Sequence, residues 1–358
     1  MCLARGADQA EALGEKNAGL EVNAFGGKVE RFTFSENCGL GVRVWVGGRT
    51  GRAYSSDFSR EALAAAVDSA LVGAKVSLED PCRRLPEAEL WPAGAGEGVF
   101  LGQESGIYFA DVESTSPAEK IEFALEMERL ALACDPRVKR AEAAVYTDVS
   151  GEVLLASTLG FRAGYRSSLC YGYIFAIAEE DGEAQTGFGF TAGRSFSSLD
   201  AAAAAQEASS IAVRMLGARQ LESARLPVLL SDVCAVELVG AVGAALNGEE
   251  VVKGRSFLAG KLGEGVASGR FSLVDDGLMK GGFGTAPFDG EGVAESRKIL
   301  VEGGILRSFM HNCYTASRMG LRTTGNASRS GYRSAVGVGH TNLYLEPGEH
   351  ATEELRGG

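Results

Sequence analysis

Hydrophobic and polar residues alternate with a period of two in the first part of the chain. The segments Leu20–Phe34 and Gly41–Ser56 each alternate on both sides of a central glycine pair. Alternation interrupted by paired glycines is typical of two strands joined by a tight turn. The pattern therefore predicts two β-hairpins near the N-terminus.

Other segments follow the helical period. Leu63, Val67, Ala70, Leu71 and Ala74 fall on one face of a helix over about Ser59–Val76. A second helix begins after Ser116, because Ser116-Pro117-Ala118-Glu119 is a capping box with proline at the first helical position. It runs to about Cys134, and a third helix spans about Leu199–Leu216.

Short strands fill the region between the second and third helices. The pattern predicts an antiparallel meander with strands near Ala141–Tyr146, Val153–Ser157, Phe161–Arg166, Leu169–Ala178 and Gln185–Thr191. The second half of the chain is predicted to begin with a short strand at Pro227–Leu230 and a helix at Asp232–Leu246. Beyond this helix the sequence consists mostly of short strands and glycine turns.

This order of elements favours an α+β fold with two domains. Strands in runs and helices in runs argue against a doubly wound α/β sheet. We expect an N-terminal α+β domain of hairpins, meander and packed helices at 1–217, and a polar linker at 218–226. We expect a mostly antiparallel β domain with one helix at 227–358.

Composition and charge restrict the classes of partner that this chain can bind. The formal net charge of the 358 residues is -12, and no run of basic residues exceeds Arg83-Arg84, so direct binding of nucleic acid is disfavoured. The sequence shows neither a signal-peptide core nor an apolar run of membrane-spanning length. The seven cysteines are odd in number and scattered, which favours free thiols in the cytoplasm.

The segment Lys280–Leu306 is the most specific part of the chain. It combines glycines, a Pro-Phe-Asp turn, an acidic pair and a basic pair. With GLGVRVWVGGRTGRAYSSDFSREAL, GRSFLAGKLGE and NCYTASRMGLRTTGNAS, it resembles the TldD/PmbA family, once called modulators of DNA gyrase. The four blocks occur in the family's order and spacing over most of the chain.

The resemblance implies two kinds of member. The TldD kind carries H-E-x-x-x-H on the helix after the first strand of the second domain, where two imidazoles bind zinc and the glutamate takes a proton from bound water. The matching helix here, Asp232–Leu246, has no histidine; the three histidines of the chain are His311, His340 and His350. The chain is therefore identified with the PmbA or TldE kind.

Two residues on this helix could still bind a metal. Cys234 and Glu237 are three positions apart, but two ligands do not make a zinc site. We interpret Cys234 as a small buried packing residue and Glu237 as a surface or capping group. We thus expect no metal ligands and no catalytic residues in this chain, and zinc in a partner subunit.

The resemblance also implies the partner and the substrate. A PmbA/TldE-type chain is expected to join a TldD-type zinc subunit, or a second copy of itself, in a protease for small unfolded peptides. The family usually continues past the point where this chain ends, at residues 353–358, with a segment of strands that supplies another zinc ligand in TldD-type members. The chain is then either a fragment or a shortened member.

The glycine-rich block is the candidate peptide-binding site. Glycines leave the backbone open to pairing with an extended chain, phenylalanines can pack apolar side chains, and the charged residues can hold termini. For single residues, turns and internal salt bridges are the competing interpretation. The candidates are Gly281, Gly282, Phe283, Gly284, Phe288, Asp289, Glu291, Arg297 and Arg318.

Two other functions stay open. His311 and Cys313 would share one face of a strand, so an independent hydrolase with a cysteine nucleophile is an alternative, although a structural histidine is favoured. A regulatory protein-binding module acting on gyrase is the other. No G-x-S-x-G elbow and no phosphate-binding loop of the G-x-x-x-x-G-K-[ST] type occurs in the sequence.

Overall fold

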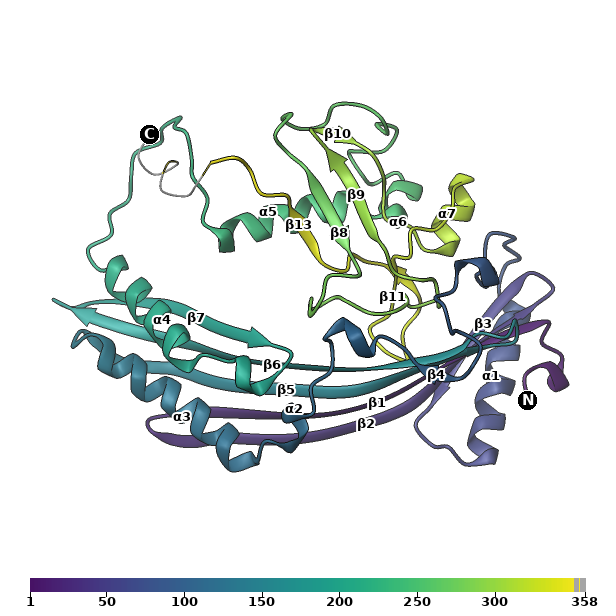
Figure 1. The fold of residues 1–358 in the computed structure, drawn as a ribbon, viewed down its shortest axis with the longest axis horizontal. Coiled ribbons are helices and arrows are strands. Elements are labelled where there is room, and N and C mark those ends of the chain that lie inside the picture. Colours follow the sequence, from purple (N-terminus) through teal and green to yellow (C-terminus); the bar gives the residue numbers. More distant parts are fainter. Residues whose placement is uncertain (351–353, 355–358) are drawn as a thin grey trace.

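The computed structural model describes residues 1–350 and residue 354. The expectation about the chain's end at 353–358 falls, apart from Glu354, outside these residues. A long, curved, mainly antiparallel sheet forms the N-terminal part, and the smaller C-terminal part lies over one of its faces (Figure 1). The α+β fold class is confirmed.

Seven strands form the large sheet, in the order β3-β2-β1-β5-β6-β4 with β7 also paired to β6. The two predicted hairpins share their middle strand β2, and the five predicted meander strands are in fact three long ones. The strands are β1 (Gln9–Phe25), β2 (Lys28–Val46), β3 (Arg49–Ser55), β4 (Val99–Phe100), β5 (Val138–Ser157), β6 (Arg162–Glu180) and β7 (Glu183–Gly193).

Helices cover the two ends of this sheet (Figure 1). The predicted helices are confirmed, including the capping box in which Ser116 and Glu119 exchange hydrogen bonds. Helix α1 packs on β3 and β2 at one end, and α3 and α4 pack on the strands at the other. The bounds are α1 (Arg60–Val76), α2 (Asp111–Ser114), α3 (Pro117–Cys134) and α4 (Ala201–Met215).

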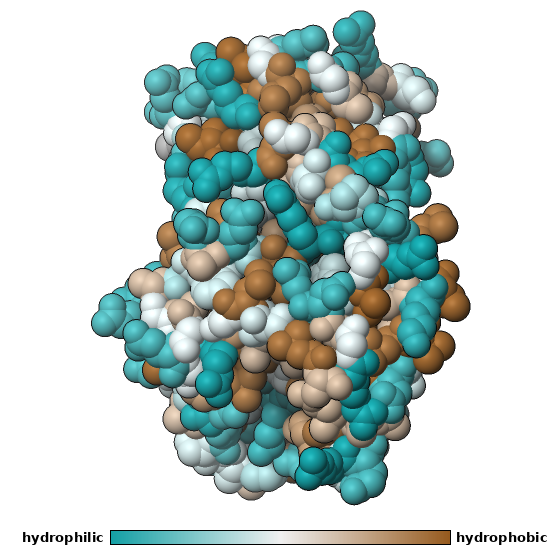
Figure 2. Space-filling model, turned by 90° about the vertical axis from the view of Figure 1, so that its right-hand side faces the viewer, coloured by the Kyte–Doolittle hydropathy of each residue, from teal (hydrophilic) through white to brown (hydrophobic). Residues whose placement is uncertain are grey.

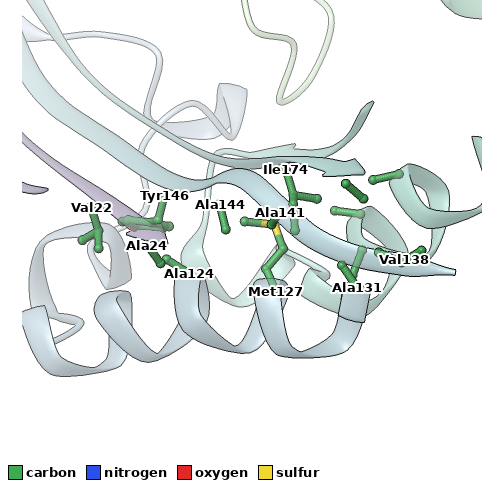
Figure 3. Packing of buried hydrophobic residues seen from close by; sticks show 14 of the residues in the cluster. Val22, Ala24, Ala124, Met127, Ala131, Val138, Ala141, Ala144, Tyr146 and Ile174 are labelled. Atoms are coloured by element: carbon green, nitrogen blue, oxygen red, sulfur yellow. The ribbon is translucent and has the colours of Figure 1, made fainter. Parts of the chain in front are cut away.

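The main core lies between α3, α4 and the sheet. Met127 and Ala124 of α3 point towards Tyr146 and Ile174 of the strands, and all four side chains are fully buried (Figure 3). Small residues allow the close approach of α4, since a methyl group at Gly189 would lie 2.0 Å from the carbonyl oxygen of Ala204. The sheet is thereby fixed as a rigid floor for the C-terminal part.

Up to residue 350, the C-terminal part contains a four-stranded sheet in the order β10-β9-β8-β13, a two-stranded sheet, and three helices. Its core gathers Leu246, Leu273, Leu300 and Leu306. The strands are β8 (Leu273–Asp276), β9 (Arg297–Glu302), β10 (Ile305–Leu306), β11 (Ala327–Ser328), β12 (Gly337–Val338) and β13 (Leu343–Leu345). The helices are α5 (Asp232–Ala245), α6 (Gly248–Val252) and α7 (Cys313–Met319).

The segment before α5 differs from the prediction. Pro227–Leu230 has no regular structure, so the short strand predicted there is wrong. Its apolar side chains, such as Val228, are exposed rather than paired into a sheet. Among residues 1–350, no helix is both long and apolar enough to cross a bilayer.

Candidate functional site

A buried ionic network joins the large sheet to the C-terminal part. Arg43 on β2 donates to Glu11 on β1 at 3.0 Å and to Glu291 at 3.1 and 3.2 Å. Arg329 also donates to Glu11, and its Nε donates to the carbonyl oxygen of Gly290 at 2.7 Å. Two strands of the sheet and two loops of the C-terminal part are thus tied together by two carboxylates and two guanidiniums.

Neighbouring guanidiniums keep the buried Glu11 carboxyl ionised. Burial by itself disfavours the charged form of Glu11, but the guanidiniums of Arg43 and Arg329 outweigh it and lower the pKa of the Glu11 carboxyl. The second oxygen of Glu291 accepts the backbone N–H of Cys313 at 2.9 Å. Glu291 therefore also fixes the start of α7.

Asp289 shapes the loop beside this network. Its carboxylate accepts backbone N–H groups from Glu291 at 2.8 Å, Val293 at 3.0 Å and Ala327 at 2.9 Å. Burial, with the nearby charge of Glu291, raises the pKa of Asp289 to about 7. The acidic pair of the glycine-rich block is thus built into the loop scaffold.

A second buried polar cluster lies on β8 and β9. Lys298 contacts Glu295 at 3.0 Å and Asp275 at 3.3 Å, and Asp275 is fully buried. Asp275 also accepts from Asn326 at 2.7 Å and from the backbone N–H of Thr341 at 2.6 Å. Burial raises the pKa of Glu295 to about 8, although the Lys298 ammonium opposes this rise.

A cavity of about 250 Å³ lies between the two parts of the molecule. Strands β1, β5 and β6 form one wall, and the glycine-rich block and the loop before β13 form the other. Phe288 and Tyr165 give it an apolar side, while Glu295, Arg329 and His340 give it a polar side. The arrangement resembles a small ligand site, with convergent polar groups in a concave surface.

The predicted glycines lie in tightly packed turns. Gly281 has a positive φ of 70° and donates its N–H to Ser105 at 2.8 Å, so it contacts the N-terminal part. The carbonyl oxygen of Gly282 accepts from Arg194 at 2.6 Å. Gly284 lines the 250 Å³ cavity, and a methyl group there would lie 2.4 Å from the carbonyl oxygen of Thr341.

The two predicted phenylalanines have opposite environments. Phe283 is 58% exposed and its ring lies 5.9 Å from the guanidinium of Arg194. Phe288 is buried against Phe161 and Tyr165, with ring centroids 5.2 and 5.3 Å away. Phe283 is therefore available to a ligand at the surface, whereas Phe288 forms part of the wall between sheet and block.

The two predicted arginines, Arg297 and Arg318, lie in different environments. Arg297 is exposed on β9 and pairs with Glu346 at 2.5 Å. Arg318, in the last turn of α7, lines a separate cavity of about 1080 Å³ beside β3. The prediction that the nine residues bind peptide stays a prediction.

The residues that the structure describes do not group into a zinc site. Cys234 and Glu237 on α5 are both exposed, so the interpretation of Cys234 as a buried packing residue is wrong and that of Glu237 as a surface group is right. Among the described residues, no histidine joins Cys234 and Glu237 to complete a set of metal ligands. Within the described part of the chain, no three His, Cys, Asp or Glu side chains are grouped so that they could hold a metal.

His311 and Cys313 do not form a nucleophile and base on one strand face. Cys313 begins helix α7 and is buried; burial, with Glu291 nearby, raises the pKa of its thiol. His311 is also buried, its Nδ1 lies 3.1 Å from Thr315 Oγ1, and burial lowers its pKa to about 4. A protonated, buried thiol is a poor nucleophile.

Several residues of the junction were not predicted from the sequence. Glu11, Arg43 and Arg329 each look like an ordinary charged residue in a strand or loop. Arg43 and Glu291 are 248 positions apart, so no local spacing marks the pair. The only sequence signal is the single charge inside GVRVWV, which an otherwise apolar strand would bury next to a counter-charge.

Comparison with known proteins gives matches over most of the chain. The chain matches the family models of the PmbA/TldA metallopeptidase domain 1 at residues 10–74, the central domain at 110–216 and the C-terminal domain at 223–358. It is 29% identical to metalloprotease PmbA of Escherichia coli O157:H7 over 322 residues, 89% of this chain and 69% of that protein. A metalloprotease of Methanocaldococcus jannaschii is 28% identical over 92% of this chain and 71% of its own length.

Solved structures show the same fold. A proposed modulator of DNA gyrase from Thermotoga maritima superimposes with a TM-score of 0.87 at 24% identity, over 99% of this chain and 77% of that one. TldE from Thermococcus kodakarensis gives a TM-score of 0.80 at 20% identity, over 98% and 77%. At these identities the structures establish the fold alone. The three matched family models establish the family, and the chain belongs to the PmbA/TldD metallopeptidases.

Proposed function

We propose that this chain is the non-zinc subunit of a two-subunit peptidase, in which a TldD-type partner holds the zinc ion. The observation that carries the proposal is a metallopeptidase chain whose helix α5 contains no histidine and offers only Asp232, Cys234 and Glu237 as ligand types. Zinc bound in the partner would activate water and polarise the scissile carbonyl. The substrates would be small unfolded peptides.

The part played by this chain would be to form walls of the substrate compartment. The network of Arg43, Glu11 and Glu291 supports this role, because it holds the glycine-rich block against the large sheet. A rigid wall excludes folded proteins and keeps an extended peptide in a fixed position.

The glycine-rich block would contact the peptide. Phe283 is exposed and available to apolar side chains, and the tightly packed turns at Gly281, Gly282 and Gly284 would hold it in place. Phe288, Asp289 and Glu291 are all buried, so they would support the peptide-contacting residues without touching the peptide themselves. Arg297, at the end of the block on β9, and Arg318, on α7, would act on peptide ends or acidic side chains.

The division of the chain into residues 1–217, a linker at 218–226 and residues 227–358 is part of the proposal. All residues of the linker are exposed and without helix or strand, which supports a boundary there. The two parts would nevertheless work as one wall, because the buried ionic network connects them.

Co-expression with a TldD-type subunit tests the proposal. We expect a mixed complex on size-exclusion chromatography, and cleavage of a fluorogenic unfolded peptide only by the mixed complex or the partner, with inhibition by a chelator. Each chain alone is the control. Cleavage by this chain alone that survives the chelator would refute the proposal, as would failure of the two chains to associate at micromolar concentration.

A further inference from the structure

A second, larger cavity lies on the side of the molecule that carries β3, α1 and α7. Its volume is about 1080 Å³, and it is lined by strand β3, the end of α1 and the loop at 329–336. Figure 2 shows this side of the molecule, with strongly hydrophilic side chains across its middle. None of the buried clusters described above fills it.

Arginines dominate the charge of this cavity. Two of the six, Arg43 and Arg329, are engaged with Glu11 in the buried network. Arg52, Arg318 and Arg333 have no carboxylate within 4.0 Å in the described residues, and Arg83 reaches Asp80 only at 3.8 Å. The arginines lining the cavity are Arg43, Arg52, Arg83, Arg318, Arg329 and Arg333, against Glu79 and Asp80.

Aromatic rings hold two of these guanidiniums in place. Arg333 lies over Tyr54 and Tyr332, at 5.5 and 5.1 Å from the ring centroids, and its Nε donates to the Tyr332 hydroxyl at 2.9 Å. Arg83 lies 4.5 Å from the ring centroid of Tyr314. Stacking fixes the guanidinium plane while leaving its outer N–H groups free to bind an anion.

A smaller cavity continues the same surface inward. It shares Arg43, Thr50, Arg83 and Val336 with the larger one and adds Arg84 together with Glu249 and Glu291. The Nε of Arg43 is buried and has no hydrogen-bond partner in the described part of the structure. An unpartnered guanidinium donor therefore lies at the floor of the surface, in a chain whose net charge is -12.

A free strand edge runs along the cavity. Strand β3 is the last strand of the large sheet, paired on one side with β2. Its consecutive residues 50–54 all line the cavity. The outer edge of β3 therefore offers main-chain N–H and C=O groups beside the unpaired arginines, and an extended peptide can add to such an edge.

We propose that this cavity binds an extended acidic peptide. Its main chain pairs with the edge of β3, and its carboxylates pair with Arg52, Arg318 and Arg333. Paired carboxylates suit guanidiniums because both are planar and form two parallel hydrogen bonds. Nucleic acid is disfavoured, since its backbone has no equivalent of strand pairing with the edge of β3.

The proposal builds on the proposed function, because it names acidic segments as a preferred class of peptide. It nevertheless concerns this chain alone and requires neither zinc nor cleavage. Failure to form a peptidase with a TldD-type subunit would leave peptide binding measurable, so the two ideas fail in separate experiments.

Fluorescence anisotropy tests the proposal. The probes are a labelled eight-residue peptide with glutamates at alternate positions, and the same peptide with glutamines in their place. We expect saturable binding of the acidic peptide by the full chain at low salt, at least tenfold weaker binding of the glutamine peptide, and weakening by salt. This comparison needs no variant of the protein.

Variants locate the site. Arg52→Gln and Arg333→Gln should each weaken binding of the acidic peptide about three- to tenfold. Arg129→Gln, an exposed arginine of α3 paired with Glu126, is the matched control and should leave binding unchanged. Circular dichroism and the unfolding midpoint confirm that each variant is folded.

Three outcomes would overturn the proposal. The first is equal binding of the acidic and glutamine peptides, or no saturable binding up to about 1 mM, the weak end of specific association. The second is loss of binding in Arg129→Gln but not in the cavity variants. The third is tighter binding of a single-stranded oligonucleotide of equal charge that depends on the same arginines.

Discussion

The guanidinium of Arg43 donates from both terminal nitrogens to one carboxylate oxygen of Glu291, at 3.2 and 3.1 Å. This pair links strand β2 of the large sheet to a loop 248 residues further along the chain. Glu11 completes the charge balance from the neighbouring strand. The junction between the two parts of the molecule thus depends on Arg43, whose guanidinium pairs with the carboxylates of both Glu11 and Glu291.

Replacing the central arginine should strongly destabilise the protein. Arg43→Met leaves Glu11 and Glu291 buried, with Arg329 as the only guanidinium still on Glu11. Breaking a buried ion pair from one side costs about 3–5 kcal/mol, and we expect a loss of unfolding free energy of that size in urea titration. Arg129→Gln, which removes an exposed pair, should cost less than about 1 kcal/mol. Equal effects of the two substitutions would contradict the buried network.

Glu295 should make stability depend on pH. Its pKa in the folded chain, about 8, lies above the ordinary value, so the folded state binds its proton more tightly than the unfolded state. The stability contributed by this protonation is fully present below the ordinary carboxyl range, near pH 4, and is lost as the pH rises towards about 8. The nearby charges are Lys298, Asp275 and Asp289.

Glu295→Gln isolates this contribution. Glutamine keeps the shape and cannot ionise, so the fall in unfolding free energy between pH 5 and pH 8 should shrink by an amount on the order of a few kcal/mol. Urea midpoints of both proteins at the two pH values provide the measurement. A pH dependence identical in the two proteins would show that Glu295 titrates normally.

The close approach of the loop at 329–336 to the sheet should forbid a side chain at Gly41. A methyl group there would lie 2.0 Å from the carbonyl oxygen of Tyr332, and backbone cannot easily move away. We expect Gly41→Ala to lower the unfolding free energy by about 1–3 kcal/mol, as overpacking does.

A glycine in open space is the matched control. Nothing lies within 4 Å of a methyl group at Gly240, in the exposed part of α5. Gly240→Ala should stabilise the chain by about 0.5–1 kcal/mol, because alanine favours the helix. Thermal melts of both variants are sufficient, and a Gly41→Ala protein as stable as wild type would disprove the close contact.

Limited proteolysis should cut the proposed linker first. Arg219 and Arg225 are exposed and lie in a segment without helix or strand. We expect brief trypsin treatment to give two fragments that meet within residues 219–225 and stay associated on a gel-filtration column, because the buried network holds them. Earlier cleavage at Arg140 or Arg166, which lie in strands of the large sheet, would argue against this boundary.

Local signals in the sequence predicted the elements better than their extent. The capping box at Ser116 located the start of α3, and the paired glycines located the turns, because both depend on neighbouring residues alone. The hydrophobic pattern predicted several short strands where the structure has single long ones. Lys28–Cys38 of β2 is exposed on both faces, so hydrophobic alternation could not show that the strand is continuous.

The candidate site was less predictable from sequence. The glycine-rich block indicated the right region, but Arg43, the ion-pair partner of Glu291, lies 248 positions away in the chain. The strand predicted at Pro227–Leu230 has the composition of a buried strand, yet no neighbouring strand pairs with it in the described residues. Pairing is a tertiary property that local composition does not determine.

Zinc analysis of the purified chains tests the central claim most directly. This chain alone and its mixture with a TldD-type subunit would each be equilibrated with zinc, desalted and analysed by mass spectrometry for metal per chain. The account predicts far less than one zinc per chain for this protein alone, and about one per TldD-type subunit in the mixed complex. One tightly held zinc per copy of this chain alone, together with chelator-sensitive peptide cleavage, would contradict it.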